Sequence, residues 1–167
     1  MKILTWLTLF FLWTNSDKKS YKVKPGIGLD DIVIGKSTIN EVLSYGNLEF
    51  EIDSGTSISC GEISSCEANF IKIHSKTNGI TFTFSTPCLK DPEKHKLKLV
   101  SIYLHETSGA CLDNGICINK STYKDVIKIM GKIKGNNNDQ YLFYYEDGIE
   151  LNFNEEGILY SVEIYHR

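Results

Sequence analysis

The sequence predicts an α+β fold made of two tandem modules, each a short helix packed on an antiparallel β-meander. Three segments recur in the same order in both halves of the chain, and each pair shares its pattern of apolar and polar positions. The pairs are KSTINEVL at 36–43 with KSTYKDVI at 120–127, NGITFTF at 78–84 with DGIELNF at 147–153, and LVSIYL at 99–104 with LYSVEI at 159–164. Because such self-similarity indicates repeated structural units, we expect a first module at 25–106 and a second at 110–167. A chain of 167 residues is long enough for one compact domain or two very small ones.

The N-terminal residues predict a secretory signal peptide at 1–16. Met1 and Lys2 give a short positive start, residues 3–13 form an apolar run, and small or polar residues follow before a charged stretch. The apolar run is shorter than the roughly 20 residues that span a bilayer, so we expect no membrane insertion after cleavage. An uncleaved N-terminal anchor is the alternative. Residues 17–24 are expected to be a linker, and the mature protein is expected to be periplasmic or secreted.

Each module is expected to open with a short amphipathic helix. Thr38 with Glu41, and Thr122 with Asp125, have the spacing of a capping box, in which the hydroxyl accepts a hydrogen bond from the third helical N–H and the carboxylate faces the exposed amides of the first turn. The apolar residues then follow the helical period. They are Ile39, Val42 and Leu43 in the first copy, and Tyr123, Val126, Ile127 and Met130 in the second. A glycine soon follows each run and is able to end the helix.

After each helix the hydrophobic period changes to two, which is typical of antiparallel strands with one buried face. The turn pairs NG at 78–79 and DG at 147–148 suit tight hairpins, so strands are expected before them at 70–74 and 141–145. The large apolar side chains of the strands are expected to face the helices. They are Phe82, Phe84, Ile102, Leu104, Leu151, Phe153, Val162 and Ile164.

The side chains that alternate with these form an outer face, which we expect to bind another protein. The expected contact residues combine aromatic rings with charged and polar groups. They are Tyr103, His105, Glu150, Asn152, Glu163, Tyr165, Tyr141 and Phe143. Tyrosine is favoured at interfaces because it is large, stiff and amphipathic. The alternative is that these residues only cover the back of the sheet or the seam between the modules, since tyrosine also fits a half-buried strand.

All five cysteines lie in the expected mature chain, and export to an oxidising compartment favours disulfides. Cys60 with Cys66, and Cys111 with Cys117, share one spacing, and each pair suits a hairpin closed by a bond, although the connectivity stays open. Cys88 is left over, either as an unpaired structural thiol or as a reactive one, which would need a nearby histidine and a lowered pKa. Because no C-x2-C pair occurs and the histidines are scattered, no metal site is expected.

Charge and motifs argue against several functions. The net charge is −3 at pH 7 with no block rich in Lys and Arg, whereas binding to nucleic acid requires a concentrated basic surface that neutralises phosphates. The sequence contains no nucleophile elbow, zinc-protease motif, Walker loop or dinucleotide-binding fingerprint. We therefore expect a protein that is not an enzyme and uses no cofactor. An active site assembled from distant residues is the alternative.

Several short segments resemble the repeat of beta-lactamase-inhibitory-protein-like domains. They are GIG at 26–28, IGKST at 34–38, EVL at 41–43 with the glycine at 46, GI at 79–80 and LVSI at 99–102. A similar module occurs singly in the SmpA/OmlA (BamE) outer-membrane assembly lipoproteins, but the first cysteine here is Cys60, too far from the N-terminus for lipidation. The resemblance implies two sheets that form a concave surface clamping a partner enzyme, with a loop inserted into its active site. It does not imply a beta-lactamase target, because no target-contacting residue can be matched.

The residues and the resemblance lead us to expect an exported, non-enzymatic protein that binds another protein. The expected role is that of an inhibitor or immunity protein that blocks a partner enzyme or toxin. One alternative is a structural envelope-assembly factor of the BamE type, which would associate with outer-membrane components. Another is a thiol-dependent enzyme, in which Cys88 would alkylate faster than the other cysteines.

Overall fold

The computed structural model describes a defined part of the chain. The described ranges are 21–60, 65–86, 96–131, 141–144 and 148–165, and at 47, 57–60, 65–67 and 141–144 they include the backbone alone. The expected signal peptide at 1–16 and Cys88 lie outside these ranges. No helix in the described ranges is long and apolar enough to cross a membrane.

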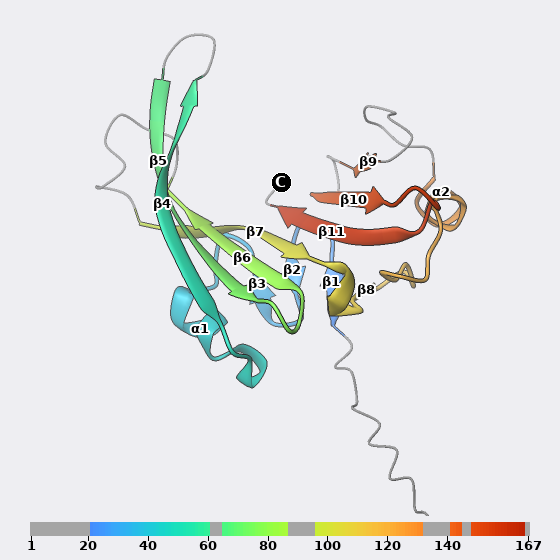
Figure 1. Ribbon diagram of the computed structural model, residues 1–167, viewed down its shortest axis with the longest axis horizontal. Coiled ribbons are helices and arrows are strands. Elements are labelled where there is room, and N and C mark those ends of the chain that lie inside the picture. Colours follow the sequence, from blue (N-terminus) through green and yellow to red (C-terminus); the bar gives the residue numbers. More distant parts are fainter. Residues whose placement is uncertain (1–20, 61–64, 87–95, 132–140, 145–147, 166–167) are drawn as a thin grey trace, which may run out of the picture.

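The fold is α+β, with most of its regular structure in two sheets (Figure 1). The larger sheet has seven strands in the order β4-β5-β6-β7-β11-β10-β9, and each neighbouring pair is antiparallel. Its strands are β4 (Glu51–Cys60), β5 (Ser65–Ser75), β6 (Ile80–Ser85), β7 (Lys98–Leu104), β9 (Tyr141–Tyr144), β10 (Ile149–Phe153) and β11 (Leu159–Tyr165). The smaller sheet has the order β3-β2-β1-β8. Its strands are β1 (Lys22–Lys24), β2 (Gly28–Leu29), β3 (Ile32–Val33) and β8 (Cys111–Leu112).

The described helices begin where the sequence predicts. They are α1 (Ile39–Leu43) and α2 (Tyr123–Met130), with 3-10 turns η1 (Tyr45–Asn47) and η3 (Glu106–Ser108). Both predicted capping boxes are confirmed: the N–H of Glu41 donates to Thr38 Oγ1 over 3.3 Å, and the N–H of Asp125 donates to Thr122 Oγ1 over 3.3 Å. In return, the carboxylate of each acid accepts from the N–H of its threonine, over 2.7 Å and 2.9 Å. The first helix ends at Leu43, before the glycine expected to end it.

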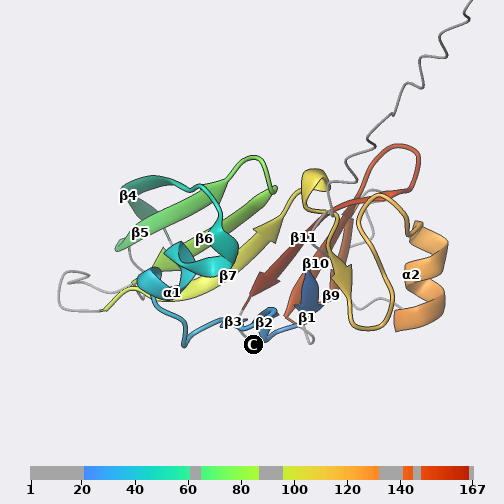
Figure 2. The same ribbon diagram turned by 90° about the horizontal axis from the view of Figure 1, so that it is seen from below.

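One face of the seven-stranded sheet forms the core. All the strand side chains predicted to face the helices are at most 2% exposed. They are Phe82, Phe84, Ile102, Leu104, Leu151, Phe153, Val162 and Ile164. The ring of Tyr45 in η1 packs edge-on against Phe82 with centroids 6.0 Å apart, and that of Tyr123 in α2 packs against Phe153 at 5.7 Å. Both helical segments therefore cover the same face of the sheet (Figure 2).

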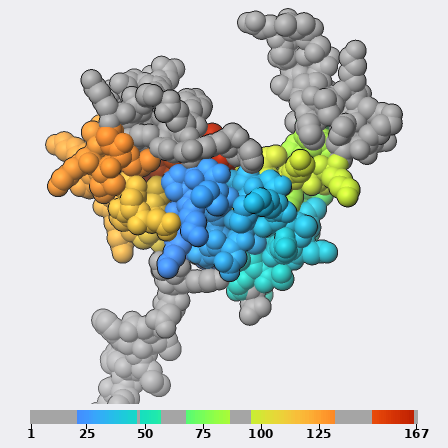
Figure 3. Space-filling view, turned by 180° about the vertical axis from the view of Figure 1, so that it is seen from behind, coloured from blue at the N-terminus to red at the C-terminus, as the bar shows by residue number. Residues whose placement is uncertain are grey.

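The small sheet also packs on the core. Val23, Leu29 and Leu112 are at most 3% exposed, and the N-terminal segment lies between the half that contains α1 and the half that contains α2 (Figure 3). The expected linker at 17–24 therefore includes a strand of the fold, since β1 begins at Lys22. The strands of the small sheet have only two or three residues each, which is too short to show a hydrophobic period, so this sheet was not predicted.

A disulfide closes the hairpin that follows β8. Cys111 and Cys117 are bonded, with their sulfurs 2.04 Å apart and their Cα atoms 4.1 Å apart. A bond across so short a loop shapes the hairpin more than it stabilises the whole fold. The other pair of equal spacing lies on β4 and β5, where the backbone register sets Ser59 opposite Cys66, and the side chains of Cys60 and Cys66 lie outside the described part.

Asp30 joins η1 to the small sheet. The hydroxyl of Tyr45 donates to Asp30 Oδ2 over 2.5 Å, and the N–H of Lys22 donates to Asp30 Oδ1 over 2.9 Å. Burial, followed by this hydrogen bond to Asp30, raises the pKa of Tyr45 far above its usual value. Burial and the Asp30 charge also raise the pKa of Tyr21. Both phenols therefore hold their protons more tightly in the folded chain than in the unfolded one.

The Tyr45→Phe substitution tests this contact. At pH 7 it is expected to lower the free energy of unfolding by about 1–2 kcal/mol, because Asp30 loses a hydrogen-bond donor. Since the folded pKa is raised, the stabilisation is complete below the unfolded pKa of about 10 and is lost progressively as the pH rises from there towards the folded pKa, because unfolding in that range releases a proton. Urea unfolding at about pH 8 and about pH 11 measures the difference. The variant is expected to show a smaller alkaline loss than wild type, and an equal loss contradicts the assignment.

Candidate protein-binding face

The second face of the seven-stranded sheet is not covered by any described helix or strand (Figures 1 and 2). We refer to the side chains that alternate with the core on β4 to β7, β10 and β11 as the open face. The strand register aligns one row of these positions across the whole sheet. The row is Glu51, His74, Thr81, Tyr103, Glu163 and Glu150, and the backbone of Phe143 on β9 pairs beside Glu150 at its end.

Tyr103 lies at the centre of the open face. It is on β7, opposite Thr81 on one side and Glu163 on the other. Its hydroxyl donates to Ser161 Oγ over 2.9 Å, and its ring meets the His105 ring edge-on with centroids 4.4 Å apart. Because the hydroxyl is tied to β11 and the ring is only half-buried, Tyr103 presents a fixed aromatic surface.

His105 provides a neutral ring beside Tyr103. Partial desolvation lowers the pKa of His105, the electrostatic influence of the His74 imidazole lowers it further, and the Glu106 carboxylate opposes both effects. At pH 7 the imidazole is therefore uncharged, with one nitrogen as donor and the other as acceptor. An exposed ring of this kind is able to accept or donate a hydrogen bond to a bound protein.

Glu150 and Glu163 form an acidic pair on the second half of the face. They are directly opposite each other on β10 and β11, and both are half-buried. Burial raises the pKa of Glu150, the hydrogen bond with Asn152 counteracts it, and the charge of Glu163 raises the pKa again. The two carboxylates repel each other, because like charges in directly opposite positions are unfavourable. Together they place negative charge beside Tyr103.

Asn152 differs from its expected role as a contact residue. It is 4% exposed, and Ser161 opposite it is 1% exposed. Strand alternation places both on the outer face, but alternation alone does not show whether such a position is covered. The two side chains instead support the face, Asn152 by bonding Glu150 and Ser161 by accepting from Tyr103.

Of the remaining expected contact residues, Tyr165 is described with its side chain, whereas Tyr141 and Phe143 are described by their backbone alone. Tyr165 is half-buried on β11 opposite Ser101, and its hydroxyl donates to the Ile149 carbonyl over 3.4 Å. Tyr141 and Phe143 occupy positions on β9 opposite Asn152 and Glu150, and their side chains lie outside the described part.

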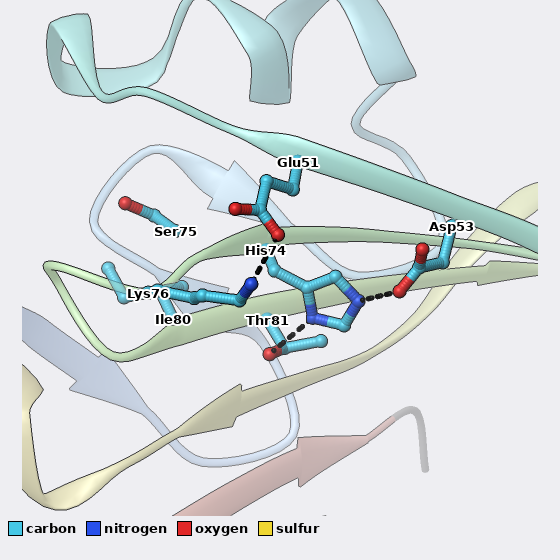
Figure 4. Close-up of a pocket in the computed structure, with 7 residues that line it drawn as sticks. All are labelled: Glu51, Asp53, His74, Ser75, Lys76, Ile80 and Thr81. Carbon is cyan, nitrogen blue, oxygen red and sulfur yellow. Dashed lines mark hydrogen bonds and ion pairs between the residues drawn. The ribbon is translucent and has the colours of Figure 1, made fainter.

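A hollow of about 360 Å³ lies at the first half of the face, where β4, β5 and β6 adjoin (Figure 4). His74 Nε2 is 3.0 Å from Asp53 Oδ2, and His74 Nδ1 is 3.1 Å from Thr81 Oγ1. Beside them, Lys76 Nζ is 2.6 Å from Glu51 Oε2. When the neutral ring carries its proton on Nε2, that nitrogen donates to Asp53 while Nδ1 accepts from the Thr81 hydroxyl.

Sequence reasoning did not select His74 or Asp53. The period-two pattern of the strand expected at 70–74 already places His74 on the face opposite the buried Ile73. Asp53 was harder to find, because the sequence predicted a hairpin near Cys60 and Cys66 but no strand that reaches back to Asp53. The pairing of Asp53 with His74 depends on a register between two strands of unequal length, which the sequence does not encode locally.

In hydrolases, an aspartate orients a histidine, and the histidine activates the hydroxyl of a nucleophilic serine or threonine. Asp53, His74 and Thr81 stand in the same order. Here the Asp53 side chain is 75% exposed, so the series is not shielded from water. Thr81 lies on β6, which has strand partners on both sides, so the backbone N–H groups of β6 are used in the sheet and do not stabilise an oxyanion. Within the described ranges, no three His, Cys, Asp or Glu side chains lie close enough together to hold a metal ion.

Comparisons with known proteins do not extend this description. No protein-family model matches the chain, and no match was found among the curated proteins or the solved structures.

Proposed function

We propose that the chain consists of two copies of one module, in which α1 with β5 to β7 corresponds to α2 with β9 to β11, and β4 is an addition to the first copy. Hydrogen bonds at equivalent positions of the three recurring segments support the proposal. The equivalent bonds are Val33 N–H to Ser37 Oγ and Cys117 N–H to Ser121 Oγ, both 2.9 Å; Gly35 N–H to Leu99 O and Asn119 N–H to Leu159 O, both 2.8 Å; and His105 N–H to Gly79 O at 2.7 Å and Tyr165 N–H to Gly148 O at 3.0 Å. Such agreement in fine geometry is expected of related units and not of an accidental likeness in composition.

The register between β7 and β11 adds further support. Tyr103 and Glu163 are equivalent in the recurring segments, and they are also paired with each other. On either side of them, Leu104 pairs with Val162 and Ile102 pairs with Ile164. This is the register of a local twofold axis through the Tyr103–Glu163 pair. The open face would then be one composite surface, with equivalent contributions from both modules and Tyr103 at its centre.

We infer that this protein is an exported, non-enzymatic binder that uses the open face to hold another protein, in the manner of an inhibitor or immunity protein. The single observation that carries the proposal is that one whole face of the sheet, with Tyr103, His105 and the Glu150–Glu163 pair on it, has no described helix or strand over it. Aromatic side chains held in fixed positions among polar groups are the usual anchors of protein interfaces. The Cys111–Cys117 disulfide is compatible with the oxidising compartment that export implies.

Recovery of a partner tests the proposal. The mature chain, immobilised and exposed to periplasmic or culture extract, is expected to retain one protein in equal stoichiometry. Tyr103→Ala combined with Tyr165→Ala is expected to lose it, because both rings are removed from the open face. Ile129→Ala is the matched control, since Ile129 is 46% exposed on α2, on the opposite side of the sheet. Recovery of nothing, or of a complex that the double substitution leaves intact, contradicts the proposal, and recovery of outer-membrane assembly components would favour an envelope role.

A further inference from the structure

We propose that β4 pairs with the β4 strand of a second copy of this chain, so that two large sheets join edge to edge. β4 is the first strand in the order of its sheet, and among the described strands it pairs with β5 alone. Residues 51–54 and Thr56 are exposed. N–H and C=O groups left open along a sheet edge are a template for another strand. This inference is independent of the proposed function.

β4 lacks most of the features by which edge strands usually avoid such pairing. Those features are short length, a bulge, Pro residues and charged residues, Lys above all, and of these β4 has only the two acids Glu51 and Asp53. β4 has ten residues, contains neither Lys nor Pro, and keeps an unbroken register with β5 from Glu51 opposite His74 to Cys60 opposite Ser65. The strand at the other edge, β9, has only four residues. The β4 edge is therefore the one suited to extend the sheet.

Ile52 gives the edge an apolar contact. It lies opposite Ile73 on β5, yet Ile52 is 54% exposed and Ile73 is 0% exposed. The two residues share the core side of the sheet, so the apolar surface of the core continues to the edge and is open there. A strand added beside β4 would cover Ile52 and remove this surface from water.

The charges of β4 favour a second copy in the antiparallel orientation. Glu51 and Asp53 lie at the start of the strand, and residues 54–60 carry no charge. Antiparallel pairing sets the acidic end of each strand against the uncharged end of the other, whereas parallel pairing in register would set each acid beside its own copy. Both acids are also engaged within their own chain, Glu51 by Lys76 at 2.6 Å and Asp53 by His74 at 3.0 Å. Repulsion between copies is thereby reduced.

The geometry of such a pair has a functional consequence. An antiparallel pair of identical strands has a twofold axis normal to the sheet, so the two open faces lie on the same side of one continuous sheet. The dimer would present two candidate binding faces side by side. A surface or assembly that displays repeated copies of a target would then be held more tightly than a single copy.

Sedimentation velocity of the mature chain tests the proposal. Over a concentration series from about 5 to 500 µM, the wild type is expected to shift reversibly from the monomer mass to twice that mass. Ile52→Lys places a charge on the pairing edge and is expected to raise the dimer dissociation constant at least tenfold. This corresponds to a loss of about 1.4 kcal/mol or more in the free energy of dimerisation. Ser54→Lys acts at the next position on the same side of β4 and is expected to do the same. Ile129→Lys alters a similarly exposed isoleucine on α2 and is expected to leave the dissociation constant unchanged.

Three results would overturn the proposal. The first is a wild-type chain that stays monomeric across the series. The second is a dimer whose dissociation constant is equal in the wild type, Ile52→Lys and Ser54→Lys. The third is a dimer that persists as a band on a non-reducing denaturing gel, which is an intermolecular disulfide. Circular dichroism and thermal unfolding of each variant verify that a loss of dimer is not a loss of fold.

Discussion

Replacing Phe82 by alanine is expected to lower the free energy of unfolding by about 3–5 kcal/mol. Phe82 is 0% exposed in the middle of β6, and the rings of Tyr45 and Phe50 pack edge-on against it with centroids 6.0 Å and 6.1 Å away. Truncation removes the buried ring and leaves a cavity that these neighbours fill only in part. The aromatic contacts that hold η1 against the sheet are lost at the same time.

The matched control for Phe82 is Thr83→Ala on the same strand. Thr83 faces the open side and is half-buried, so its truncation is expected to cost less than about 1 kcal/mol. Urea unfolding followed by circular dichroism measures both variants, with the denaturant slope as a check that the unfolded state is unchanged. Equal losses for the two variants would contradict the assignment of the sheet faces.

Replacing Gly148 by alanine is expected to cost about 2–5 kcal/mol, the sum of backbone strain and steric overlap. Gly148 has φ +64°, in the region that favours glycine. A Cβ there would lie 2.6 Å from the Cα of Gly26 and 2.6 Å from the carbonyl oxygen of Tyr165. Both are backbone atoms that a rotamer change does not move. Gly148 O also accepts from the N–H groups of Gly26 and Tyr165, so any shift of this residue disturbs the contact between the small sheet and β11.

Gly109→Ala separates the two contributions at Gly148. Gly109 has φ +60°, but a Cβ there meets nothing within 4 Å. Gly109→Ala is therefore expected to lower the free energy of unfolding only by the strain of the left-handed conformation, about 1–2 kcal/mol. Thermal unfolding of the two variants, measured side by side, gives the difference directly. If Gly109→Ala lost as much as Gly148→Ala, the close approach of Gly148 to Gly26 would not be what requires glycine.

The elements that were predicted well are those whose signal is local. Thr38 and Thr122 cap their helices because each has an acid three residues later, and that spacing is visible in the sequence. The strands β6, β7, β10 and β11 alternate apolar and polar residues, so their buried faces follow from periodicity alone. The same alternation predicted that Tyr103, Glu150 and Glu163 share one face.

The elements that were missed depend on distant partners. β4 has small and polar residues, such as Ser54 and Gly55, and becomes a strand because β5 pairs with it along its whole length. The small sheet combines β1 with β8, which lie far apart in the sequence and are held by a parallel pairing of Lys22 with Cys111. In the candidate site, the contact between His74 and Asp53 arises from that β4–β5 register, and the burial of Asn152 arises from packing that alternation does not report.

Binding at the open face is tested most directly by titration calorimetry of the recovered partner against three forms of the mature chain. Relative to wild type, Tyr103→Ala is expected to weaken binding by about 30-fold or more, because a central aromatic anchor of an interface contributes about 2 kcal/mol or more. Ile129→Ala, on the helix side, is expected to bind as wild type does. If Tyr103→Ala bound with unchanged affinity while Ile129→Ala lost it, the partner would occupy the helix side, and the open face would not be the binding surface.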